Sequence, residues 1–152
     1  MKNLDQTDRK LLRLLQQDCR ITIKELSKKL YLSNTPVYER IKKLEKRGII
    51  KGYVALLEPE VLDRSMVVFI SLSMENHSRD AVEKFKNEVM VLTEVMEFYY
   101  TSGNYDALIK LMVKDMNAYS IFVQEKLSKI DIVSRFNSTF IISSSVKTVF
   151  DI

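Results

Sequence analysis

The chain has 152 residues, of which 46% are hydrophobic and 29% charged, so it can bury a core in one ordinary domain or two small ones. No apolar run approaches the roughly 20 residues that a membrane span needs, and the first residues resemble no signal peptide. We therefore expect a cytoplasmic protein. The single cysteine, Cys19, excludes an intrachain disulfide and a thiolate metal cluster, and its helical spacing predicts a buried side chain.

The net charge of +4 is unevenly distributed along the chain. Residues 1–60 carry 14 Lys and Arg against 8 Asp and Glu, whereas residues 61–152 carry 10 against 12. A basic half joined to a mildly acidic half suggests that only the first half meets a polyanion.

The N-terminal half predicts three helices. Asp5 or Thr7 can cap the first, whose apolar residues recur at helical spacing. Thr22 and Glu25 form a capping-box pattern that opens a short second helix. A tight turn at residues 31–32 leads to a third helix, which we expect Ser33 to cap and which should end at Arg47.

Two further features define the end of this half. Pro36 lies in the first turn of the third helix, where its missing N–H costs little, and Gly48 is a suitable residue to end that helix. Strand-like segments follow at residues 49–50 and 53–57, and residues 58–60 look like a hinge. We expect a first domain with its strand linker at residues 1–60, and a second domain at 61–152.

The C-terminal half alternates between strand and helix patterns. Apolar residues recur at period two in four segments, while Ser78 and Asp115 can cap two helices between them. The third strand follows the second after a short turn, which indicates a hairpin. The order βαββαβ predicts an α+β, ferredoxin-like domain with strands at residues 66–74, 96–100, 107–113 and 136–142.

The second face of this sheet is also rich in apolar residues. Two helices can cover only one face, and the other face carries Val67, Phe69, Tyr99, Leu108, Met112 and Ile141 among a few polar residues. Such a face is too apolar to remain in water, so we expect a second copy of the chain to cover it.

The third helix has the character of a DNA recognition helix. A turn of three to four residues joins it to the second helix, as in helix-turn-helix domains. Small polar residues at its start suit base edges, and the later basic residues suit phosphates, although some are solvated surface. The candidate DNA-binding residues are Ser33, Asn34, Thr35, Val37, Tyr38, Arg40, Lys42, Lys43 and Lys46. A three-helix scaffold with a merely solvated basic face is the simpler alternative.

A series of motifs resembles the Lrp/AsnC family of leucine-responsive, or feast/famine, transcriptional regulators. The motifs extend through nearly the whole chain in the family's order, at residues 4–12, 18–20, 25–26, 32–33, 37–41, 44–53 and 101–106. The resemblance implies a winged helix-turn-helix, joined by a strand linker to a ferredoxin-like effector domain. It also implies homodimers that assemble further, often into octamers, and an amino-acid effector bound between effector domains.

The turn that resembles the family's Gly-Asp-Tyr-Asp motif is the candidate effector site. A glycine lets backbone N–H groups approach a carboxylate, and Asp106 can receive an ammonium group. The candidate ligand-binding residues are Thr101, Gly103, Asn104, Tyr105, Asp106 and Ser138. Asn104 stands where the family usually has Asp, and Asp131-Ile132 replaces the usual Pro-Gly. A plain hairpin turn is the alternative, because Gly and Asn are ordinary turn residues.

Three functions are compatible with a chain of this organisation. The first is a sequence-specific transcriptional regulator, nucleoid-associated in a bacterial or archaeal cell, whose assembly or DNA binding responds to a small effector. The second is an architectural protein that compacts DNA without strong base readout. The third is an enzyme on the same architecture, such as a tetrapyrrole decarboxylase. The sequence disfavours an enzyme because the only histidine, His77, lies in a polar stretch expected to be a loop or a helix start. We expect no metal and no cofactor.

Overall fold

The computed structural model describes residues 4–152, and the chain divides into two compact units. The first comprises Met1–Leu56 together with Ser145–Ile152, and the second comprises Leu57–Ser144. The C-terminal residues 145–152 thus group with the N-terminal unit, whereas the sequence suggested that all residues after 60 form one domain. Within the described residues, no helix has the length and apolar character to cross a membrane.

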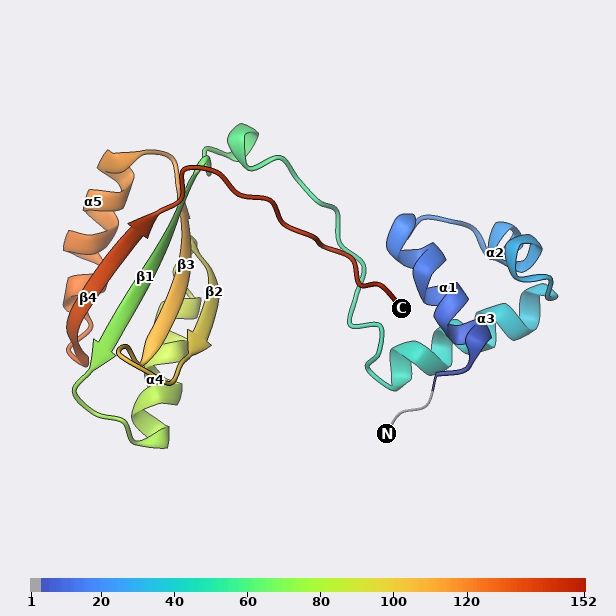
Figure 1. Ribbon diagram of the computed structural model, residues 1–152, viewed down its shortest axis with the longest axis horizontal. Helices are drawn as coiled ribbons and strands as arrows, with labels where there is room; N and C mark the ends of the chain where they lie inside the picture. Colours follow the sequence, from blue (N-terminus) through green and yellow to red (C-terminus); the bar gives the residue numbers. More distant parts are fainter. Residues whose placement is uncertain (1–3) are drawn as a thin grey trace. The chain divides into compact units, whose positions relative to one another are not determined.

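The first unit is built from three helices: α1 (Gln6–Gln17), α2 (Ile23–Leu30) and α3 (Asn34–Lys46) (Figure 1). Each helix turns its apolar stripe inward, as the spacing predicted. The buried core consists of Leu11 from α1, Leu26 and Leu30 from α2, and Val37, Ile41 and Leu44 from α3. The three-helix arrangement expected from the sequence is therefore confirmed.

The helix ends also follow local chemistry. Asp5 caps α1 and Thr22 caps α2, each with a reciprocal capping box. Between α2 and α3 the chain reverses at Tyr31, whose φ of 57° is left-handed. Gly48, with φ of 65°, follows the end of α3, and its N–H donates to the carbonyl of Glu45 at 2.8 Å. This geometry explains why glycine stands there.

The C-terminal tail is fastened to α1 by one side chain. The amide of Gln16 accepts from the backbone N–H of Phe150 at 2.7 Å and donates to the carbonyl of the same residue at 3.1 Å. This paired contact explains why residues 145–152 group with the helices.

Two expectations for this unit were wrong. Cys19 is exposed, because α1 ends at Gln17 and the residue falls in the turn beyond the apolar stripe. The segment 53–57 forms no strand, and Val54 and Leu56 are about three-quarters exposed, at 76% and 75%. A strand needs a hydrogen-bonding neighbour, and the described part of the chain offers this segment none.

The second unit is the expected α+β sandwich. Its strands are β1 (Met66–Met74), β2 (Val95–Tyr100), β3 (Ala107–Val113) and β4 (Val133–Phe140), and its helices are α4 (Arg79–Met90) and α5 (Met116–Glu125). Two short 3-10 helices, η1 (Pro59–Leu62) and η2 (Leu127–Lys129), precede β1 and follow α5. The antiparallel sheet has the order β2-β3-β1-β4, so the βαββαβ fold is confirmed (Figure 1).

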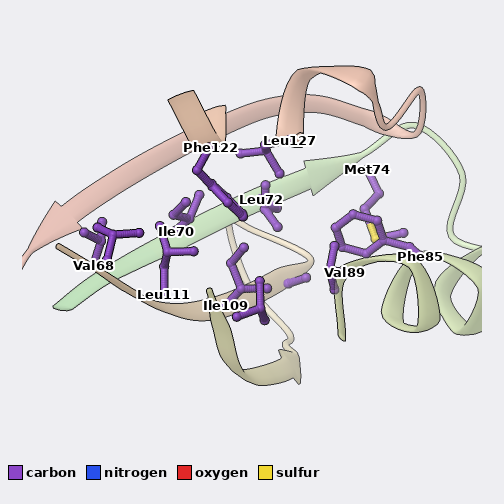
Figure 2. Close-up of a cluster of buried hydrophobic side chains, with 13 residues drawn as sticks. Val68, Ile70, Leu72, Met74, Phe85, Val89, Ile109, Leu111, Phe122 and Leu127 are labelled. Atoms are coloured by element: carbon purple, nitrogen blue, oxygen red, sulfur yellow. The ribbon is translucent and has the colours of Figure 1, made fainter. Parts of the chain in front are cut away.

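Both helices cover the same face of this sheet. Phe85 of α4 and Phe122 of α5 share a core with the alternating inward residues of β1 and β3 (Figure 2). The inward residues are Val68, Ile70, Leu72 and Met74 from β1, and Ala107, Ile109, Leu111 and Val113 from β3. The period-two pattern therefore marks the core face correctly.

The last strand differs from its expected range. It runs from Val133 to Phe140 rather than from 136 to 142, and Ile142 is fully exposed beyond its end. Pairing with β1 sets these limits: Val68 lies opposite Phe140 and Met74 opposite Val133. Its position on the sheet, and not its own apolar pattern, determines where the strand ends.

Candidate functional site

Helix α3 presents its polar face to solvent. Asn34, Thr35 and Tyr38 are all exposed in its first turn and a half, as a reading surface requires. The side chain of Ser33 makes no capping hydrogen bond, although its backbone precedes the helix in the expected extended conformation. Four of the predicted contact residues thus lie together on or beside the start of α3.

Val37 must be removed from the predicted contact residues. Its side chain has no exposed surface, because it fills the core between the three helices. A residue at this spacing belongs to the inner stripe of the helix, so it supports α3 without touching DNA.

The basic residues of α3 differ in whether a carboxylate of the same chain forms an ion pair with them. Lys43 and Lys46 are exposed and have no ion pair in the structure of residues 4–152. Lys42 pairs with Glu45 at 2.9 Å and lies 5.7 Å from the ring centre of Tyr38. The ion pair raises the pKa of Lys42 and offsets part of its charge.

Arg40 forms ion pairs with two aspartates of its own domain. Its Nη1 lies 2.6 Å from Oδ2 of Asp5 and 2.6 Å from Oδ1 of Asp8, both at the start of α1. The backbone N–H of Asp8 and the guanidinium together hold the pKa of the Asp5 carboxyl below its usual range, while the two carboxylates raise the pKa of Arg40. The contact fastens α3 to α1, which leaves little of this charge for phosphate. Its role in DNA binding remains a prediction.

The turn at residues 101–106 is organised by hydrogen bonds of its own residues. The hydroxyl of Thr101 donates to the carbonyl of Tyr105 at 2.7 Å, and its backbone N–H donates to the carbonyl of Asp106 at 2.8 Å. Gly103 has φ of 133°, a conformation that favours glycine. Asn104 is exposed at the tip. The predicted turn residues therefore do come together.

Asp106 connects this turn to β1. Its Oδ2 accepts from the backbone N–H of Met74 at 2.8 Å, and its backbone N–H donates to the carbonyl of Leu72 at 2.8 Å. The other carboxylate oxygen lies 3.4 Å from Nδ1 of His77, which is in the loop before α4, as expected. Oδ2 is therefore used to hold the turn against β1, and only Oδ1 is placed to accept from an ammonium group of a ligand.

Ser138 lies away from the turn. It stands opposite Ile70 on the helix-covered face of the sheet, and its hydroxyl is 2.7 Å from the hydroxyl of Tyr119 on α5. The sequence grouped it with the turn, but the strand register places it under a helix. We therefore drop Ser138 from the candidate ligand-binding residues.

Comparison with known protein families gives a match for each of the two parts of the chain. A family model described as winged helix-turn-helix DNA-binding matches residues 4–51, and one described as Lrp/AsnC ligand binding domain matches residues 67–149. Leucine-responsive regulatory proteins of Escherichia coli and Klebsiella pneumoniae are 40% identical over 146 residues, covering 96% of this chain and 88% of theirs. The chain belongs to the Lrp/AsnC family.

Solved Lrp/AsnC structures have the same fold. A transcriptional regulator from Neisseria meningitidis, crystallised as a complex with L-Met, superposes with a TM-score of 0.90 at 35% identity, covering 98% of this chain and 97% of its own. An AsnC-family regulator from Agrobacterium tumefaciens gives a TM-score of 0.90 at 36% identity and covers 97% of each chain. Like other Lrp/AsnC proteins, this chain is a transcriptional regulator with a DNA-binding and a ligand-binding domain, and not an enzyme.

Sequence reasoning missed two residues beside the Lrp/AsnC turn. His77 approaches Asp106, and the guanidinium carbon of Arg135, on β4, lies 5.4 Å from the ring centre of Tyr105. They are 29 and 30 residues away from their partners in the sequence, so no local motif connects them. The only available signal was the strand order, which brings β4 next to β1.

Proposed function

We propose that this Lrp/AsnC regulator reads duplex DNA with α3 and responds to an amino acid at the 101–106 turn. The exposed start of α3 supports the first part, since Asn34, Thr35 and Tyr38 offer hydrogen-bonding groups where a recognition helix meets base edges. The L-Met bound to the Neisseria meningitidis protein supports the second. Residues 1–60 would form the reading domain and residues 61–152 the effector domain, acting on the nucleoid of a bacterial or archaeal cell.

Phosphate contacts would come chiefly from Lys43 and Lys46. Their charges have no intramolecular partner in the structure of residues 4–152, so they can neutralise phosphates without breaking an existing pair. Lys42 and Arg40 would contribute less, because Glu45 and the two aspartates already balance them. Base readout and phosphate binding are thus assigned to successive turns of one helix.

The exposed face of the sheet supports a homodimer. Val67, Phe69, Leu108 and Met112 alternate with the core residues and are only partly covered within one chain. Among them, Glu97 accepts from Tyr99 and from Lys110, the latter at 3.0 Å. A second copy would bury this apolar surface while its charges remain paired. Further assembly of the dimers into an octamer is what membership of the Lrp/AsnC family implies.

A selection experiment tests the proposed function. The full-length protein selects binding sites from random duplex DNA, and we expect a palindromic consensus with half-sites about one helical turn apart, or a multiple of it. Binding to the selected site is then competed with random DNA at the same salt concentration. If no consensus emerges and random DNA competes equally well, the protein is an architectural one and not a sequence-specific regulator.

A further inference from the structure

Arg135 lies at the end of the sheet where the 101–106 turn begins. It stands opposite Ser73 in the β1–β4 ladder, and Ser73 alternates with the inward-facing Leu72 and Met74. Opposed residues of an antiparallel pair share a face, so Arg135 projects from the face without helices. Its guanidinium crosses β1 and lies over the ring of Tyr105.

The stacking fixes the guanidinium but leaves its donors available. The guanidinium carbon is 5.4 Å from the centre of the Tyr105 ring, which is a cation–π distance. Within one chain Arg135 is exposed, and among residues 4–152 no carboxylate forms an ion pair with it. Arg40, by contrast, has two carboxylate partners. An arginine held in one orientation with free N–H groups at its edge matches the two oxygens of a carboxylate.

The neighbouring charge has the opposite sign. Asp106 directly follows Tyr105, and one of its oxygens is free of the backbone and faces His77. A cation stacked on one residue of the turn and a carboxylate on the next present the two charges that a zwitterion needs. Asn104 is neutral, so Asp106 is the sole carboxylate of the turn. The turn therefore carries one negative charge beside the one positive charge of Arg135.

We propose that Arg135 binds the carboxylate of the amino-acid effector, with Tyr105 orienting its guanidinium. Asp106 receives the ammonium group, which takes the place beside its free oxygen where His77 now lies. The inference rests on the proposed function, because it assigns the groups that recognise the effector at the same turn. Arg135 is then a residue that determines which charge pattern the site accepts.

A thermal-shift screen of full-length protein tests this assignment. Each of the twenty amino acids is added to the wild type, to Arg135→Ala and to Lys129→Ala, which removes a positive charge from an exposed residue of η2. Any amino acid that raises the Tm of the wild type is compared with its C-terminal amide. We expect the amide and the Arg135→Ala variant each to lose at least about tenfold in affinity, with no further loss when both changes are combined.

The outcomes separate the two proposals. If no amino acid shifts the wild type, the effector function itself fails, and the assignment of Arg135 fails with it. If the shift persists in Arg135→Ala, the effector function stands and the assignment is wrong. If Arg135→Ala lowers the mass of the assembly measured by light scattering, the arginine is a subunit contact and the assignment is also overturned. A loss of shift with unchanged mass, and with a normal Lys129→Ala, supports it.

Discussion

Arg40 on helix α3 and Asp8 on helix α1 are joined by a contact of 2.6 Å between Nη1 and Oδ1. The side chain of Asp8 is only 12% exposed, and the Arg40 guanidinium supplies the opposite charge beside it. Because Asp5 contacts the same guanidinium nitrogen, one arginine holds the start of α1 against the recognition helix. The contact therefore controls the position of α3, and it makes Arg40 primarily a structural residue of the reading domain.

Replacing Arg40 should lower the free energy of unfolding more than it lowers the affinity for DNA. Arg40→Ala leaves the nearly buried Asp8 carboxylate without its cation, and we expect the free energy of unfolding to fall by about 1–3 kcal/mol. Urea denaturation followed by circular dichroism measures this change. Lys43→Ala, on the same helix, is the matched control and should leave stability within about 0.5 kcal/mol. Equal stability of the two variants would show that Arg40 is a surface charge.

The same contact predicts a dependence on acid. Hydrogen bonding and the guanidinium hold the pKa of Asp5 below its usual range, so its stabilising effect is complete above the ordinary aspartate pKa of about 3.9. That effect disappears as the pH falls through the lower folded-state pKa. Wild type and Asp5→Asn should thus differ in Tm at pH 6 to 7, and the difference should disappear only at a pH below the ordinary aspartate pKa. A constant difference across this range would contradict a stabilising role of the ionised Asp5 carboxylate, which the Asp8 backbone N–H and the Arg40 guanidinium both favour.

The two free lysines of α3 should set the salt dependence of DNA binding. Lys43→Ala and Lys46→Ala each remove about one phosphate contact, so each should lower the slope of log affinity against log salt by about 1 on any DNA sequence. Fluorescence anisotropy at several salt concentrations measures the slope. Lys42→Ala is the comparison, and its slope should change less because Glu45 already neutralises this lysine. A larger change for Lys42 than for Lys43 would reverse the assignment.

Base readout should be separable from phosphate contact. Asn34→Ala should relax discrimination between sites, at about 1–3 kcal/mol for a lost bidentate base contact, while the salt slope stays the same. Repeating the selection from random DNA with this variant gives the readout. Glu39→Ala, five residues further along the same helix and also exposed, serves as the control. An unaltered consensus for Asn34→Ala would place the reading residues elsewhere.

The open sheet face should control assembly. Leu108→Lys introduces a charge opposite Ser71 on β1 and Tyr99 on β2, and we expect the dimer to dissociate to monomer. Light scattering coupled to size exclusion measures the mass. Val91→Lys adds the same charge at an exposed position following α4 and should leave the mass unchanged. A monomeric wild type, or a dimeric Leu108→Lys, would contradict the proposed interface.

Local patterns predicted the elements of this protein well, because their causes are local. The capping box at Thr22 and Glu25 and the left-handed Gly48 each depend on a few neighbouring residues. The period-two residues of β1 identify the core face for the same reason. The capping arguments failed only in part, at Ser33, whose hydroxyl makes no capping bond.

The sequence by itself determined the three helices of the first unit, the order of helices and strands in the second, the charge of the first half and the apolar second face of the sheet, since these follow from residue order and composition. The tertiary structure decided which side chains meet. Val37 is buried in the core, and Ser138 forms a hydrogen bond with Tyr119 beneath α5. Arg40 contacts two aspartates that lie more than thirty residues away in the sequence. The tertiary structure also placed Arg135 over Tyr105 by pairing β4 with β1. Such contacts depend on strand register and helix packing, which form between segments distant in sequence and leave no periodic signal in either one.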